Sequence, residues 1–177
     1  MMNIICTLLA ASLILLTCAC DKRNQPPVSA EAVLQAMLSE INPPDGRLMS
    51  LTSADESKRL SAELLTALYG APASTWYQGG AYSVVNDGAI YLSEVMHPFE
   101  LAVFRCINEG DVSGGMASVL GVCSVRLDTI RTAWQGSDYE AYVQNAVVTY
   151  YGGYVFLVVA EDPETVVKAA IKSIKSY

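Results

Sequence analysis

The sequence has little of the residue most used in catalysis and metal binding, because His97 is its only histidine. Basic residues are also scarce: 11 lysines and arginines stand against 18 acidic residues, which gives a net charge of −7. This charge repels phosphates, so nucleic acid is not an expected partner. No phosphate-binding loop, dinucleotide fingerprint, nucleophile elbow or Cys-x-x-Cys pair occurs. We therefore assign no catalytic residue, metal ligand or cofactor.

Charge is absent from residues 1–19, of which 15 are apolar. The uncharged run over 4–20 has 17 residues. It is shorter than the stretch of about 20 that crosses a bilayer as a helix, and its length is typical of a secretory signal. We predict a signal peptide over 1–19. An uncleaved anchor helix and ordinary secretion are the alternatives.

The end of this run resembles the lipobox of bacterial lipoproteins, because small Ala19 directly precedes Cys20. In that family of signals the cysteine is acylated and becomes the first residue of the mature chain. We predict lipidation at Cys20, which anchors the protein to the bacterial membrane on its extracytoplasmic side. Residues 20–28, which include Gln25-Pro26-Pro27, then form a short tether.

Cys106 and Cys123 are the cysteines that remain after removal of the signal and lipidation of Cys20. Cys106 ends a predicted strand, and Cys123 lies about 16 Å along the helix that follows. A disulfide needs Cα atoms within about 7 Å. We predict two separate buried thiols.

Residues 29–177 are expected to form a single α+β domain with a mainly antiparallel sheet. A long helix and a C-terminal helix pack on that sheet, and two further helices come first in the chain. Apolar spacing and capping residues predict helices over 29–41, 60–70, 110–136 and 139–144, and one that begins after Asp162. Alternating and apolar runs predict strands over 89–93, 100–107, 146–151 and 154–160.

A tight hairpin is predicted at Gly152-Gly153, where both turn positions need positive φ. This turn pairs Tyr151 with Tyr154 and Thr149 with Phe156. Both faces of the hairpin are apolar, so either helices cover them or one face binds something. Coverage by the two N-terminal helices is one interpretation. The other is a groove for a peptide, glycan or partner protein at Tyr151, Tyr154 and Thr149, with both tyrosines partly exposed and Phe156 more buried.

Two charged patterns have an ordinary and a functional interpretation. The spacing Glu94-x-x-His97-x-x-Glu100 would align metal ligands on a helix, but Pro98 interrupts that helix, so we expect an exposed loop histidine. In the last helix, Lys168, Lys172 and Lys175 form an outer row. We expect a solvated face there, with contact to anionic lipid headgroups as the alternative.

Several stretches resemble the bacterial lipoprotein family catalogued as domain of unknown function 4358. They are Leu-Leu-Thr-Ala-Leu-Tyr-Gly (64–70), Phe-Glu-Leu-Ala-Val-Phe-Arg (99–105), Asn-Ala-Val-Val (145–148) and Gly-Gly-Tyr-Val-Phe-Leu-Val-Val-Ala-Glu-Asp (152–162). The resemblance covers most of residues 29–175. It implies an envelope location and an α+β fold, and it implies no reaction and no functional residues.

The sequence therefore predicts a lipid-anchored binding or accessory protein of the bacterial cell envelope. With one histidine in a loop, no nucleophile–base pair can be assembled. An enzyme that acts on an envelope glycan through two carboxyl groups is the alternative. A structural spacer is the third possibility.

Overall fold

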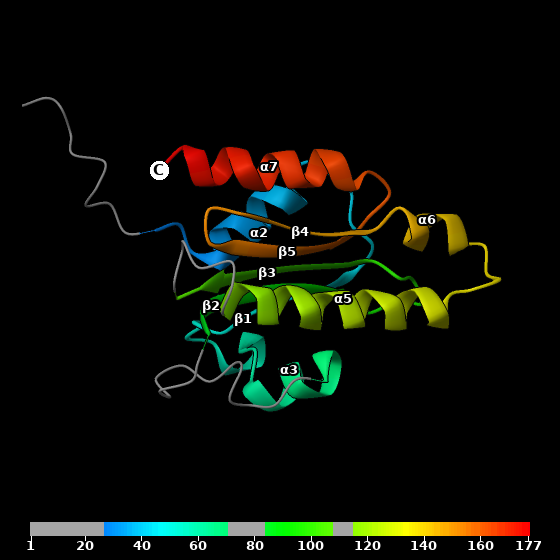
Figure 1. Ribbon diagram of the computed structural model, residues 1–177, viewed down its shortest axis with the longest axis horizontal. Coiled ribbons are helices and arrows are strands. Elements are labelled where there is room, and N and C mark those ends of the chain that lie inside the picture. The colour runs from blue at the N-terminus through cyan, green and yellow to red at the C-terminus, as the bar shows by residue number, and fades with distance from the viewer. Residues whose placement is uncertain (1–26, 71–83, 108–114) are drawn as a thin grey trace, which may run out of the picture.

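The computed structural model describes residues 27–70, 84–107 and 115–177. The predicted signal peptide, lipidation at Cys20 and most of the predicted tether lie outside these ranges, and so does the predicted start of the long helix. The described chain has the α+β fold expected from the sequence, with helices packed on both faces of an antiparallel sheet (Figure 1).

The sheet has five strands in the order β1-β2-β3-β5-β4, and every neighbouring pair is antiparallel. The strands are β1 (Gly46–Ser50), β2 (Val85–Ser93), β3 (Glu100–Cys106), β4 (Val147–Tyr151) and β5 (Tyr154–Val159). The central strand β3 is buried except at Arg105, and its neighbour β5 is buried along its whole length. These two strands therefore form the middle of the core, while β1 and β4 are the edges.

In the described part of the chain, two helices of eight residues or more pack on each face of the sheet (Figure 1). Helices α2 (Ala30–Leu38) and α7 (Pro163–Lys175) cover one face, and α3 (Ala62–Tyr69) and α5 (Gly115–Ala133) cover the other. The short α6 (Glu140–Gln144) follows α5, and a 3-10 turn, η2 (Glu56–Lys58), follows β1. None of the helices in the described ranges has the length and apolar character needed to cross a lipid bilayer.

Local sequence explains where the helices begin and end. The side chains of Ser29, Ser61 and Asp162 accept hydrogen bonds from the first-turn N–H groups of α2, α3 and α7, which otherwise lack partners. Gly70 ends α3 with φ at 68°, a conformation that glycine adopts without strain. These caps confirm the predicted start of α2 at Ser29, the predicted end of α3 at Gly70 and the predicted start of α7 after Asp162, whereas α2 ends at Leu38, three residues before its predicted end at Ile41.

Alternation along the central strands explains why the core has two halves. Phe104 and Leu157 point toward α5 and α3, whereas Leu101 and Phe156 point toward α2 and α7. The hairpin register is the predicted one, with Tyr151 opposite Tyr154 and Thr149 opposite Phe156. The expectation that the two N-terminal helices cover the hairpin is wrong, because α7 joins α2 on one face and α5 covers the other.

Strand β1 was not expected from the sequence. It has five residues, of which only Leu48 and Met49 are apolar side chains, and it lies at the edge of the sheet. Its partner β2 begins at Val85, four residues before the predicted start. An edge strand of this length carries too little alternation to stand out, so pairing with β2 and packing of Met49 in the core determine it.

Candidate functional site

A pocket of about 410 Å³ lies at the end of the sheet where β3 begins and β5 ends. Four connecting segments form it: the chain after α2, the β2–β3 turn, α6, and the β5–α7 turn. Its lining residues are Ile41, Asn42, Pro44, His97, Phe99, Tyr142, Ala160, Glu161 and Asp162. Aromatic and aliphatic side chains thus combine with a few polar groups, which is typical of a ligand site.

His97 is half-buried in this pocket, so the expectation of an exposed loop histidine is wrong. Its ring packs edge-to-face between Tyr139 and Tyr142, with ring centroids 4.6 and 5.0 Å away. Its Nδ1 accepts a hydrogen bond of 3.1 Å from the N–H of Phe99, which places the proton of the neutral ring on Nε2. Burial lowers the pKa of His97, which favours this neutral form.

Tyr142 supplies a polar group to the pocket. Burial first, and then the negative charge of Glu161, raise the pKa of Tyr142 to about 12, so its hydroxyl stays neutral. Within the described ranges, no residue forms a hydrogen bond with that hydroxyl. A half-buried hydroxyl in this position can donate to or accept from a ligand.

The two carboxylates of the pocket differ in what they contact. Asp162 accepts hydrogen bonds from the side-chain hydroxyl and the N–H of Thr165, and these two bonds lower its pKa. Asp162 is therefore held as a helix cap in its ionised form. Glu161 is exposed beside it. Together they make the rim of the pocket negative, which favours neutral or positively charged ligands.

The side chains that form the walls of the pocket are held in place by further hydrogen bonds and aromatic contacts. The Tyr91 hydroxyl donates to the carbonyl of Pro44 at 2.7 Å, and the Tyr91 ring packs edge-to-face on Phe99. On the other side, Trp134 packs on Tyr139 with ring centroids 5.3 Å apart. The site is thus preformed by aromatic packing.

A buried polar network lies next to the pocket, on the opposite face of the sheet. The carboxylate of Glu100 accepts from Nε and Nη2 of Arg126, with a shortest distance of 2.6 Å, and from the hydroxyl of Tyr69 at 2.8 Å. Burial, followed by the charge of Glu100, raises the pKa of Tyr69. The Glu100 side chain is only 3% exposed, so this network joins α3, β3 and α5 internally.

The spacing around His97 does not bring metal ligands together. Glu94 is exposed and pairs with Arg47, Glu100 is buried against Arg126, and His97 packs between tyrosines. Among the described residues, no group of three histidine, cysteine, aspartate or glutamate side chains is placed to hold a metal ion. Cys106 and Cys123 are buried free thiols, in agreement with the prediction for this pair.

The tyrosines of the hairpin do not form the expected exposed pair. Tyr154 is only 2% exposed, because the segment before α2 covers it and its hydroxyl donates to the carbonyl of Val28 at 2.6 Å. Tyr151 and Thr149 are half-buried, and Phe156 is fully buried, as predicted. Binding at Tyr151 and Thr149 stays a prediction, whereas Tyr154 has no accessible surface to offer.

The pocket at the end of the sheet could not be read from the sequence. Its residues come from segments more than 100 positions apart, and Ile41, Asn42 and Pro44 follow α2 as an apparent helix stop. The one available signal was His97-Pro98 followed by Phe99, which suggested only a turn. Comparison of the chain with known proteins gave no match to a family model, a curated protein or a solved structure.

Proposed function

We propose that the chain is a lipid-anchored, extracytoplasmic binding or accessory protein of the bacterial cell envelope. We further propose that the pocket around His97 and Tyr142 receives a neutral or positively charged segment of a partner protein. The observation that carries this proposal is a preformed pocket of about 410 Å³ with aromatic walls, a negative rim and an uncommitted tyrosine hydroxyl. A pure spacer would have no use for such a pocket.

The anchor and the pocket are compatible because they lie at opposite ends of the domain. Val28, which follows the predicted tether, is bonded to Tyr154 at the beginning of β5, whereas Ala160 in the pocket follows the end of that strand. The six residues of β5 span about 20 Å. A domain tethered through residues 20–28 would therefore present its pocket away from the anchored end.

The enzyme alternative would need two carboxyl groups in one site, one of them protonated near neutral pH. The pocket contains Glu161 and Asp162, but the pKa of Asp162 is lowered by its hydrogen bonds to Thr165. A carboxylate held ionised as a helix cap cannot act as the general acid. Both carboxylates of the pocket are exposed, so the pocket lacks the buried carboxyl group that such an enzyme would use as its acid, and this favours the binding function.

Site-specific crosslinking in a bacterial host tests the pocket. A photo-reactive amino acid replaces Asn42, which lines the pocket, or Ser57, an exposed residue of η2, in the full chain. We expect a crosslinked envelope protein from position 42 that position 57 does not give. Glu161→Lys should weaken that crosslink, because it reverses the charge of the rim. Identical adducts from both positions, or none from position 42, would contradict the pocket as a binding site.

Intact-mass analysis of the membrane fraction tests the anchor separately. We expect a mature chain that begins at an acylated Cys20 and that Cys20→Ala no longer yields. A mature chain with another first residue would show that the signal is not of the lipoprotein type.

A further inference from the structure

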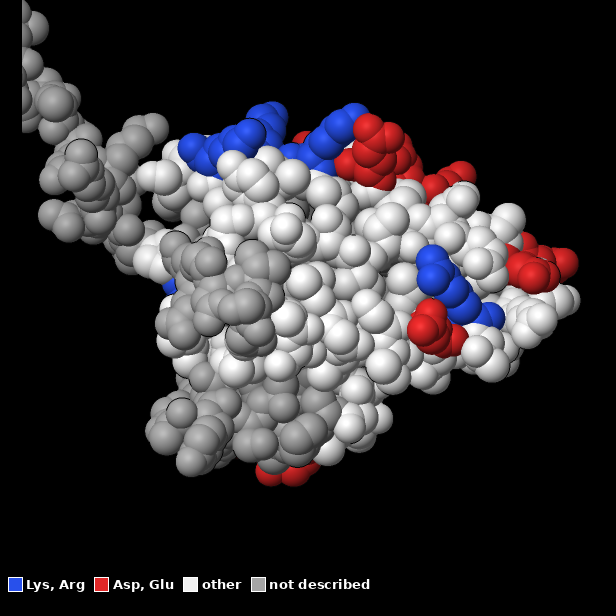
Figure 2. Space-filling model, viewed as in Figure 1, with Lys and Arg blue, Asp and Glu red and all other residues white. Residues whose placement is uncertain are grey.

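Helix α7 carries charges of both signs, separated along its length. Asp162 and Glu164 lie at its beginning, and Lys172 and Lys175 lie in its last turn. Lys168 contacts Glu164 at 2.6 Å, so its charge is balanced. Within the described part of the chain, no carboxylate lies within ion-pair distance of Lys172 or Lys175. Figure 2 shows this separation, with red near the start of α7 and blue toward its end.

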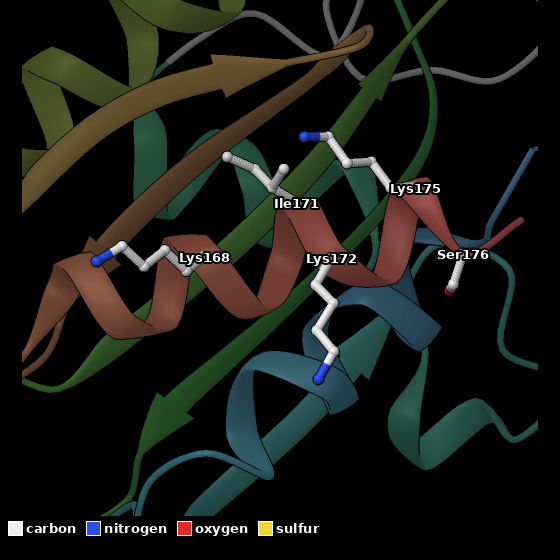
Figure 3. Close-up of a pocket in the computed structure, with 5 residues that line it drawn as sticks. All are labelled: Lys168, Ile171, Lys172, Lys175 and Ser176. Atoms are coloured by element: carbon white, nitrogen blue, oxygen red, sulfur yellow. The ribbon is translucent and has the colours of Figure 1, made fainter.

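The end of α7 combines these two ammonium groups with apolar surface. Ile171, Lys172, Lys175 and Ser176, together with Lys168, line a shallow hollow of about 400 Å³ (Figure 3). We call Ile171, Lys172, Lys175 and Ser176 the basic end of α7. In Figure 3 the side chain of Lys172 extends toward α2, and that of Lys175 extends to the other side of the helix. Flexible ammonium groups that flank an apolar residue suit the phosphate layer of a membrane surface.

The basic end of α7 lies where the described chain begins. The Lys175 ammonium is 5.4 Å from the centre of the Tyr151 ring, and Tyr151 pairs with Tyr154 across the hairpin turn. Tyr154 in turn is bonded to the carbonyl of Val28. Figure 1 shows the end of α7 beside this turn, at the end of the sheet away from α6.

The length of the tether brings this end of the domain to the membrane. Pro27 is seven positions after Cys20, and seven residues span about 25 Å at most. With Cys20 acylated, Pro27 therefore lies within about 25 Å of the headgroups, and the basic end of α7 lies at this same end of the domain, within reach of them. The chain as a whole has a net charge of −7, so only a local basic surface within about 10 Å of the lipids can be attracted to them.

We propose that the basic end of α7 binds anionic phospholipid headgroups of the membrane that holds Cys20. This inference rests on the lipid anchoring of the proposed function and adds an orientation to it. With Lys172 and Lys175 against the headgroups, α7 stands with its first turn away from the bilayer. Glu161 and Asp162 are then held away from the anionic surface, and the pocket opens at the membrane-distal end.

Lysine footprinting on the acylated full chain tests this orientation. The protein is reconstituted in vesicles of phosphatidylcholine alone or with about 30% phosphatidylglycerol, and exposed lysines are labelled with a membrane-impermeant amine reagent. We expect labelling of Lys172 and Lys175 to fall about fivefold or more in the anionic vesicles, since each basic residue near such a surface gains about that factor. Lys58, an exposed lysine of η2, and Lys168, which pairs with Glu164, are the internal controls and should be unchanged.

Two further arms identify the cause of protection. High salt should restore labelling of Lys172 and Lys175, because it screens exposed charges. Inorganic phosphate added at low concentration to neutral vesicles should give no protection, since the proposed ligand is a lipid surface. Equal labelling of Lys172 in neutral and anionic vesicles would overturn the proposal, and so would protection by free phosphate alone.

The same samples distinguish this proposal from the anchoring on which it rests. Flotation with neutral vesicles and the intact mass report whether Cys20 is acylated, whatever the lysines do. A chain that floats and is acylated, but shows no change at Lys172 and Lys175, refutes only the headgroup contact. A chain that is not acylated refutes the anchoring and the headgroup proposal with it.

Discussion

The hydroxyl of Tyr154 donates a hydrogen bond of 2.6 Å to the carbonyl of Val28, a residue 126 positions earlier in the chain. This bond joins the beginning of β5 to the segment that precedes α2. Both residues are buried, with 2% and 5% of their surface exposed. The bond therefore fixes the point at which the predicted tether leaves the domain.

Removing the Tyr154 hydroxyl should destabilise the domain. Tyr154→Phe leaves the Val28 carbonyl without its partner in a dry environment, and we expect a loss of about 1–3 kcal/mol in the free energy of unfolding. Tyr151→Phe is the matched control on the half-buried neighbour and should change little. Urea denaturation of the two variants measures the difference. Equal stability of both variants would contradict the buried bond.

Phe156 is the large side chain at the centre of the α2–α7 face. It is fully buried between β5 and the two helices, so Phe156→Ala should leave a cavity and cost about 3–5 kcal/mol. Tyr150→Ala, on the exposed edge strand β4, is the control and should cost far less. Chemical denaturation measures the two losses of stability. A larger loss for Tyr150→Ala than for Phe156→Ala would mean that Tyr150, and not Phe156, points into the core.

The Arg126–Glu100 pair should matter for stability far more than an ordinary surface pair. Arg126→Ala leaves the buried carboxylate of Glu100 with only the Tyr69 hydroxyl, and we expect a loss of about 3–5 kcal/mol. Arg47→Ala removes an exposed pair with Glu94 and should cost at most about 1 kcal/mol. Thermal denaturation measures the stability of both variants. Similar losses of stability in Arg126→Ala and Arg47→Ala would contradict the importance of the buried pair.

His97 should make stability depend on pH in a defined direction. Its folded pKa lies below the unfolded value of about 6.5, so the unfolded chain binds its proton first. The contribution of neutral His97 is complete above the unfolded pKa and is lost as the pH falls through the lower folded pKa. His97→Gln removes this dependence. Between pH 7.5 and 5, the wild-type chain should lose more stability than the variant, and parallel pH profiles would contradict the prediction.

The two core cysteines should be inert while the protein is folded. Burial raises the pKa of Cys106 to about 11, and burial with the charge of Glu100 raises that of Cys123 still further. Alkylating reagents attack the thiolate, so neither should react at pH 8 in the native state. Unfolding without reductant should release both thiols. Ser57→Cys provides an exposed positive control, and a native chain that is labelled at Cys106 as fast as at this position would refute the burial.

Local sequence was sufficient where a single residue type satisfies a backbone need. Gly152 and Gly153 have φ of 53° and 82°, so the turn and with it the whole register of β4 and β5 follow from two adjacent glycines. Asp162 followed by Pro163 likewise determines the start of α7. In each case the decisive contacts lie within a few positions.

Long-range contacts explain what the sequence did not reveal. The sequence predicts that Tyr154 is partly exposed, but Val28, 126 positions earlier, contacts it in the folded protein. The sequence likewise predicts an exposed His97, because the residues that pack on it, Tyr139 and Tyr142, are more than 40 positions away. The pocket assembles from four such connections. The sequence pattern of one segment does not indicate which distant segment will pack on it.

The packing of α2 against α7 has a consequence for the order in which the domain can form. These helices are the first and the last of the described chain, and they share one face of the sheet. Because the chain is synthesised from its N-terminus, about 130 further residues must be added after α2 before its partner helix α7 is complete. Until then the apolar side chains of that face have no cover. A nascent or truncated chain should therefore depend on chaperones until α7 is complete.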